Sequence, residues 1–277
     1  MRIDAHQHFW IYNEADYGWI GPGMETLKRD RLPTDLAPLL QAAQLDGAIA
    51  VQARTTLAET EWLLQLADQS PIIKGVVGWI DLCSPDARAQ LERFSAHPRL
   101  CGVRHIVQSE PDDRFLLRDD FQRGVALLAE FNLTYDILIF PRHLPVAYEL
   151  AVRFPDQTFV LDHIAKPFIK DHVLEPWAHD LRRLASLPNI YCKVSGLLTE
   201  ADWHEWSPAD FQPYLDVVFE AFEPRRIMFG SDWPVCTLAG SYAEVTALLA
   251  GYMRSLSAAD LIEVWGGAAE RAYQLKP

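Results

Sequence analysis

Residues 3 to 9 read Ile3-Asp4-Ala5-His6-Gln7-His8-Phe9, so two histidines lie one residue apart in a short, mostly apolar stretch. Side chains alternate between the two faces of a β-strand, and the pattern therefore predicts a strand in which Asp4, His6 and His8 share one face. Successive residues on that face, such as His6 and His8, stand about 6.6 Å apart at Cα. Two imidazoles at that spacing can both reach one cation at about 2.0–2.1 Å from nitrogen. A lone His-x-His pair is a weak signal, so its meaning depends on the rest of the chain.

The composition describes a folded protein with an acidic surface. The chain has 277 residues, of which 49% are hydrophobic and 11% aromatic, which is enough for a large core. Its net charge of −13 argues against nucleic acid or an anionic membrane as a partner, because both require clustered Lys and Arg. No apolar run reaches the ~18 residues of a membrane span, and the N-terminal strand leaves no room for a signal peptide. We therefore expect a cytoplasmic protein.

The four cysteines form no metal-binding or disulfide pattern. They are far apart in the sequence and include no Cys-x-x-Cys pair. We expect reduced and mostly buried thiols.

Apolar runs typical of buried strands alternate with segments of helical spacing along the whole chain. The predicted strands cover residues 3–9, 47–53, 72–82, 100–107, 133–140, 158–165, 190–196 and 227–233. Predicted helices begin near residues 34, 56, 84, 119, 144, 174 and 207, and two more follow residue 241. Eight such repeats predict an α/β protein that folds as a single (β/α)8 TIM barrel over residues 1–277. An open doubly wound sheet is the alternative, but no glycine-rich phosphate loop follows the first strand.

Polar residues gather at the carboxyl ends of the predicted strands, where the active sites of such barrels lie. They are His6, His8, Gln52, Arg104, His105, Asp162, His163 and Asp232. Burying these groups together without a shared ligand or hydrogen-bond network would be unfavourable. The set therefore indicates one functional site at the mouth of the barrel.

Four blocks of sequence carry a more specific signal. They read Asp4-Ala5-His6-Gln7-His8-Phe9-Trp10, Leu161-Asp162-His163-Ile164-Ala165-Lys166-Pro167, Cys192-Lys193-Val194-Ser195-Gly196 and Phe229-Gly230-Ser231-Asp232-Trp233-Pro234. Together they resemble the amidohydrolase superfamily, and within it the branch of sugar-lactone hydrolases that includes L-fuconolactonase and L-rhamnonolactonase. The blocks fall on predicted strands one, six, seven and eight.

The chain also departs from that superfamily in its metal ligands. Many members place a lysine or glutamate on strand four and a histidine on strand five, which together complete a two-metal centre. Here the run Val103-Arg104-His105 has no lysine, and Tyr135-Asp136-Ile137-Leu138 has no histidine. The resemblance therefore implies one divalent metal, with zinc the favoured ion. Its predicted ligands are His6, His8, His163 and Asp232, and the alternative is that these histidines act without a metal.

The resemblance implies a hydrolase that opens a small neutral sugar-acid lactone to its hydroxy acid. Asp232 is the predicted general base, and His163 with the other histidines, or the metal, polarises the carbonyl. The predicted substrate contacts are Gln52, Arg104, His105 and Trp233. The alternatives are a metal-dependent decarboxylase of the same superfamily and a ligand-binding barrel without activity.

Several roles stay open at this stage. Arg104 either pairs with a carboxylate or clamps an anionic oxygen, and Lys193 either pairs with Asp162 or Asp136 or contacts substrate. The aromatic segment from residue 10 to residue 33 is either a lid or part of the packing. The ring size of the lactone and the oligomeric state also stay open.

Overall fold

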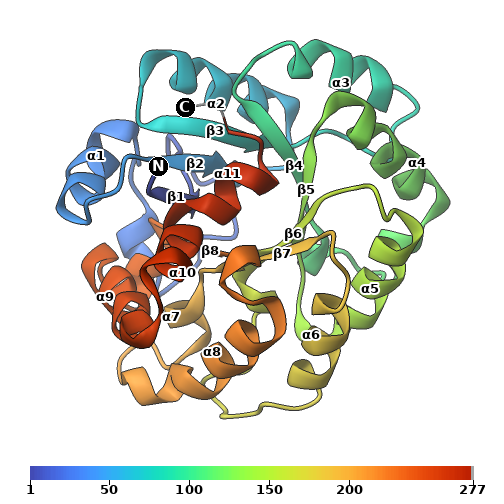
Figure 1. Ribbon diagram of the computed structural model, residues 1–277. Helices are drawn as coiled ribbons and strands as arrows, with labels where there is room; N and C mark the ends of the chain where they lie inside the picture. The colour runs from blue at the N-terminus through green and yellow to red at the C-terminus, as the bar shows by residue number, and fades with distance from the viewer. Residues whose placement is uncertain (276–277) are drawn as a thin grey trace.

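Eight parallel strands form one sheet whose spatial order is the order of the chain. The computed structural model describes residues 1–275, and its strands pair in the sequence β1 to β8 (Figure 1). The strands are β1 (Ile3–Gln7), β2 (Gly47–Val51), β3 (Ile73–Gly78), β4 (Leu100–Ile106), β5 (Thr134–Leu138), β6 (Phe159–Leu161), β7 (Ile190–Val194) and β8 (Ile227–Phe229). The His8 amide donates to the Trp233 carbonyl at 2.7 Å and the Asp232 amide donates to the His6 carbonyl at 2.8 Å, which joins the first strand to the last. The predicted TIM barrel is confirmed.

Helices follow the strands and surround the barrel. They are α1 (Pro33–Ala42), α2 (Leu57–Gln69), α3 (Ala87–Ser95), α4 (Asp119–Leu128), α5 (Leu144–Arg153), α6 (Trp177–Ala185), α7 (Leu197–Glu200), α8 (Pro208–Phe222), α9 (Tyr242–Tyr252), α10 (Ala258–Ile262) and α11 (Ala268–Ala272). The C-terminal segment was expected to form two helices, and this is corrected, because a π-helical turn at Glu263–Gly267 separates α10 from α11. Within residues 1–275, no helix is long and apolar enough to cross a membrane.

The face assignment of β1 was wrong before the position of His6, because Ile3 and Ala5, and not Asp4, share the interior face with His6. The pairing register with β2 shifts between Asp4 and Gln7, which marks a β-bulge. The bulge changes the alternation, so Ile3 lies in the interior cluster of the barrel, whereas the Asp4 carboxylate accepts hydrogen bonds from Ser231 and Tyr242. His6 still faces the charged side chains within the barrel. Asp4 therefore supports the strand from outside the site.

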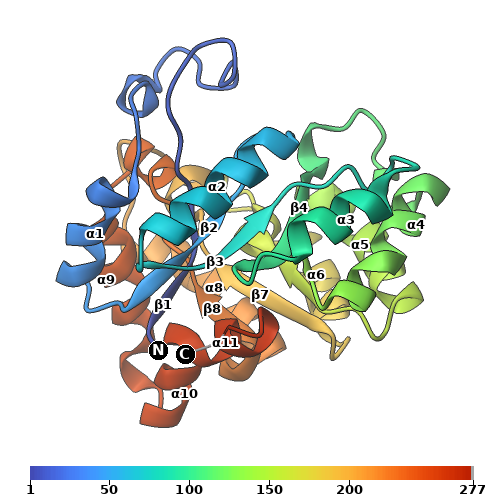
Figure 2. The same ribbon diagram turned by 90° about the horizontal axis from the view of Figure 1, so that it is seen from above.

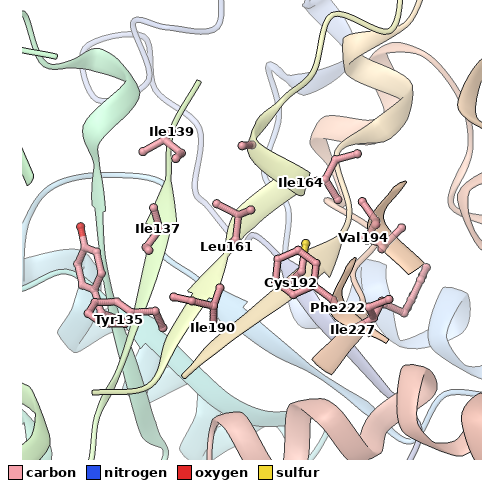
Figure 3. Packing of buried hydrophobic residues seen from close by; sticks show 14 of the residues in the cluster. Tyr135, Ile137, Ile139, Leu161, Ile164, Ile190, Cys192, Val194, Phe222 and Ile227 are labelled. Carbon is pink, nitrogen blue, oxygen red and sulfur yellow. The ribbon is translucent and has the colours of Figure 1, made fainter. Parts of the chain in front are cut away.

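Most of the hydrophobic core lies between the barrel and its helices. Every second residue of a strand contributes to it, as Figure 3 shows for Ile137, Leu161 and Cys192 on three successive strands. Asp136 and Lys193 at alternate positions of β5 and β7, and Asp162 directly after β6, face the barrel interior. The cysteines are unpaired as expected, and three of the four are buried.

The two ends of the barrel differ. Ala268, Ala272 and Tyr273 pack into the interior cluster from the end where the chain termini lie, so α11 closes that end (Figures 1 and 2). The segment 10–33 rises at the opposite end, far from the termini (Figure 2). The carboxyl ends of the strands face this second end, and the site lies there.

Candidate active site

A cavity of about 330 Å³ opens at the carboxyl ends of the strands. Its polar lining combines strand-end residues with residues of the connecting segments: His8, Arg104, Gln108, Ser109, His163, Lys166, Thr199, Glu200 and Asp232. Its apolar lining is Trp19, Met24, Ala53, Ile106, Leu138, Trp203, Val235 and Leu238. The mixture suits a small molecule that has both polar and apolar faces.

His6, His8 and Asp232 bring three potential metal ligands to one point. His6 Nε2 lies 3.2 Å from His8 Nε2 and 3.8 Å from Asp232 Oδ1, and His8 Nε2 lies 3.4 Å from the same oxygen. Ligands at about 2.0–2.2 Å from a tetrahedral ion stand roughly 3.3–3.6 Å apart. All three side chains are buried. The donor set therefore fits a single zinc-type ion.

Hydrogen bonds orient the two imidazoles toward that point. His8 Nδ1–H donates to the Val51 carbonyl at 2.8 Å, which leaves the Nε2 lone pair free for a metal. His6 Nδ1 lies 3.3 Å from Asp162 Oδ1, the usual arrangement of a carboxylate behind a metal-binding histidine. Arg104 Nη1 lies 3.3 Å from His6 Nε2, so the guanidinium is next to the three potential metal ligands.

His163 reaches the cavity from an unusual backbone turn. The four residues from His163 to Lys166 all have positive φ, between 48° and 60°. Non-glycine residues rarely adopt this conformation, and such strain concentrates at functional sites. Gly196, at φ 63°, lies against the ring, because an added Cβ would meet His163 Nδ1 at 2.6 Å. His163 Nδ1 and Ser195 Oγ share a hydrogen bond of 2.9 Å.

The electrostatic environment keeps His6 and His163 neutral and Asp232 charged. Burial lowers the pKa of His163 to about 4, although Asp232 and Asp162 oppose that effect. Burial also holds the pKa of His6 well below its ordinary value. For Asp232, burial raises the pKa, but His163 and the hydrogen bond with His8 outweigh it and hold that pKa below its ordinary value. Neutral imidazoles and an ionised carboxylate are the forms that bind a metal.

A network of buried charges lies beneath the site. Lys193 Nζ lies 2.5 Å from Asp136 Oδ2 and 3.0 Å from Asp162 Oδ1, so this lysine pairs with both acids. Arg104 donates to Asp162 Oδ2 at 2.9 Å and also lines the cavity. Arg104 and Lys193 therefore both pair with carboxylates, which is one of the two roles left open for each.

The predicted site residues do not all reach the cavity. Within residues 1–275, its lining does not include Gln52, His105 or Trp233. Gln52 accepts from Arg104 Nε at 3.0 Å and is fully buried, so it supports the arginine. His105 stacks on Phe115 with the ring centroids 4.7 Å apart. Trp233 is only 2% exposed. These placements do not support the predicted substrate contacts of the three residues.

Other side chains reach the cavity without having been predicted. Lys166 and Glu200 form an ion pair of 3.0 Å on its wall, and Trp203 lies beside them. The segment 10–33 contributes its own packing and also borders the cavity. Trp10, Tyr17, Ile20 and Leu27 pack into their own small core, and Trp19, 44% exposed, borders the cavity. The aromatic residues of this segment were the signal available in the sequence.

The four predicted metal ligands fall into two groups of potential ligands, the second of which also contains Asp162, which was not predicted as a ligand. His6 belongs to both, first with His8 and Asp232, and second with Asp162 and His163. His6 lies on β1 and His8 directly after it, whereas Asp162 and His163 follow β6 and Asp232 follows β8. The paired histidines, the third histidine and the aspartate thus lie near one another at the ends of β1, β6 and β8, and their role as metal ligands stays a prediction.

The chain matches the family described as Amidohydrolase over residues 3–275. It belongs to the amidohydrolase family. An L-fucono-1,5-lactonase from Burkholderia multivorans is 46% identical over 99% of this chain and 96% of its own length. A second L-fucono-1,5-lactonase, from Burkholderia ambifaria, is 37% identical over 90% of this chain and 86% of its own. The crystal structure of a Burkholderia multivorans amidohydrolase with bound zinc is 45% identical and superimposes with a TM-score of 0.97 over 100% of both chains.

Proposed function

We propose that this amidohydrolase opens a neutral sugar-acid lactone, of the L-fuconolactone or L-rhamnonolactone type, to its hydroxy acid. The observation that carries the proposal is the group formed by His6, His8 and Asp232, of which His8 and Asp232 line a cavity with both polar and apolar walls. The full-length similarity to two L-fucono-1,5-lactonases supports it. The fold alone would not, because barrels of this kind host many chemistries.

The buried side chains suit ester hydrolysis by an attacking water. His6, His8 and Asp232 would hold one divalent metal, which supplies Lewis-acid polarisation of the lactone carbonyl when bound. Asp232, ionised at neutral pH, accepts the proton of the water as its oxygen bonds to the carbonyl carbon. Breaking the ring C–O bond then releases an alkoxide, which takes that proton from Asp232. The product is the hydroxy acid.

His163 suits stabilisation of the negative charge on the carbonyl oxygen. It is neutral at pH 7 because burial lowers its pKa. When Ser195 Oγ donates to Nδ1, the ring carries its proton on Nε2, from where it can donate to the oxyanion. Gly196 has no Cβ, and a Cβ at this position would displace the His163 ring.

The lining favours a neutral substrate over an anionic one. Its two cationic side chains, Arg104 and Lys166, are each paired with an acid, so neither offers an unmatched positive charge. We expect activity on neutral aldonolactones to exceed that on carboxylated lactones by more than about tenfold.

A panel of matched neutral and anionic lactones, assayed with a pH indicator, tests the proposal. Acid release from neutral aldonolactones is the expected result. Release of carbon dioxide from a carboxylated substrate would instead identify a decarboxylase, and recovery of unchanged bound ligand would identify a binding protein. Faster hydrolysis of the anionic lactones would reassign Arg104 as a carboxylate clamp.

A further inference from the structure

The ion pair between Lys166 and Glu200 is built into the cavity wall. Lys166 Nζ lies 3.0 Å from Glu200 Oε1, and the two side chains are 17% and 22% exposed. Both residues line the cavity. The mechanism proposed above uses neither of them.

The backbone holds both partners in place. Lys166 ends the left-handed turn that begins at His163, and its amide donates to the His163 carbonyl at 2.8 Å. Glu200 ends the one-turn helix α7, and its carbonyl accepts from the Lys170 amide at 2.9 Å. The segment that positions His163 therefore also positions Lys166.

We propose that Lys166 and Glu200 bind adjacent ring hydroxyls of the lactone and so determine its specificity. An ammonium group donates and a carboxylate accepts, and two neighbouring hydroxyls can satisfy both at once. This inference rests on the proposed lactonase function. It assigns one wall of the cavity to the polyol edge of the substrate.

The rest of the lining agrees with that orientation. Ile106, Leu138, Val235 and Leu238 supply an apolar surface in the same cavity. A sugar lactone has carbon–hydrogen faces as well as a hydroxyl edge, and the two kinds of lining suit the two kinds of surface. A site that hydrogen-bonds substrate hydroxyls discriminates strongly against an analogue that lacks them.

A neighbouring ion pair provides a matched control. Lys170 Nζ lies 3.0 Å from Asp202 Oδ2, at the same distance as in the cavity pair. Its side chains are 62% and 39% exposed, and neither residue lines the cavity that holds the histidines. Lys170→Met therefore removes a nearby charge from outside that cavity, and the Lys170 backbone amide that donates to the Glu200 carbonyl is kept.

The experiment compares a polyhydroxylated lactone with an unsubstituted one. kcat and KM are measured for an L-aldono-1,5-lactone and for δ-valerolactone with the wild type, Lys166→Met, Glu200→Gln and Lys170→Met. We expect each cavity variant to lower the ratio of kcat/KM on the aldonolactone to that on δ-valerolactone by about 10²-fold. Lys170→Met should leave that ratio unchanged.

The outcomes separate the inference from the function on which it rests. An unchanged ratio in both cavity variants, or an equal loss on both lactones, shows a purely structural ion pair and overturns the inference alone. A wild-type enzyme that opens neither lactone overturns the proposed function and the inference with it. Thermal unfolding of each variant identifies any loss that comes from misfolding.

Discussion

Asp232 is the residue on which the proposed chemistry depends most. Its carboxylate is 3% exposed, and His8 Nε2 lies 3.4 Å from it. Asparagine keeps the size of the side chain but cannot accept a proton from water. We therefore expect Asp232→Asn to lower kcat by roughly 10²–10⁴ with little change in the melting temperature.

The metal content of the same variant separates two causes of the loss. A variant that keeps its metal but not its rate has lost a base, whereas a variant that loses its metal has lost a ligand. Near-normal turnover with either metal content would remove Asp232 from the mechanism.

The sequence predicts the central site residues because their types recur at strand ends. It does not predict the subsite of Lys166 and Glu200. Glu200 lies on a helix of one turn, and Lys166 reaches the cavity only because four successive residues adopt left-handed backbone conformations. Residue preferences disfavour such a turn, so no local pattern indicates it.

At the scale of elements, strand alternation predicts the barrel but not the bulge in β1. A bulge adds one residue to the strand and shifts the pairing register between Asp4 and Gln7, whereas Asp4, His6 and His8 still alternate regularly in the sequence. The two histidines were placed correctly relative to each other because both follow Asp4, which lies where the register begins to shift. The strands β6 and β8 are also shorter than expected. The backbone leaves the strand conformation early there, and His163 and Asp232 both have positive φ.

The first turn of α2 carries a buried carboxyl, Glu59, with a pH-dependent effect on stability. Glu59 is 3% exposed and accepts from the Arg54 amide at 2.7 Å. Burial raises its pKa from 4.5 to about 7, although hydrogen bonds from Arg54 and Ala53 oppose the shift. A raised pKa in the folded state means that stability from Glu59 is fully present below pH 4.5 and is lost as the pH rises through about 7.

Glu59→Gln should therefore unfold with a weaker pH dependence than the wild type between about pH 5 and pH 8. Urea unfolding at several pH values measures this directly. Glu61→Gln is the matched control, because Glu61 lies on the same helix with its side chain 51% exposed. Parallel pH profiles for Glu59→Gln and the wild type would show that Glu59 keeps an ordinary pKa.

For the whole molecule, the closure of the barrel by α11 links the C-terminal segment to the charges beneath the site. The Tyr273 hydroxyl lies 2.8 Å from both oxygens of Asp136, and Asp136 pairs with Lys193. Tyr273→Phe leaves the ring in place but removes a donor from a buried carboxylate. We expect it to reduce the free energy of unfolding by about 1–3 kcal/mol.

Tyr252→Phe is a suitable control for that measurement. Its hydroxyl donates to Asp216 at 2.9 Å in a more exposed setting, where water can replace it. We expect its effect on the unfolding free energy to be smaller. Equal effects of the two substitutions would argue against a special role for the buried network.

We expect the same network to limit the number of metal ions. A second group of potential ligands, His6, Asp162 and His163, lies beside the first. Lys193 Nζ stands 3.0 Å from Asp162 Oδ1 and 3.2 Å from His6 Nδ1, so an ammonium group already neutralises this second group. A divalent ion placed there would meet a fixed positive charge at short range. The charge arrangement therefore favours one metal.

We predict at most about one equivalent of divalent metal per chain, with zinc favoured by the two imidazoles and one carboxylate of the first group. Elemental analysis of the purified protein measures this number, and two ions per chain would contradict the argument from Lys193. If the metal is catalytic, a chelated preparation should lose activity and regain it with zinc. If the histidines act directly, the metal-free enzyme should keep its rate, while His163→Ala loses it. The two outcomes differ because a neutral His163 can donate a hydrogen bond to the oxyanion without help, whereas His6 and His8, whose Nε2 atoms face each other at 3.2 Å, are arranged to share an ion.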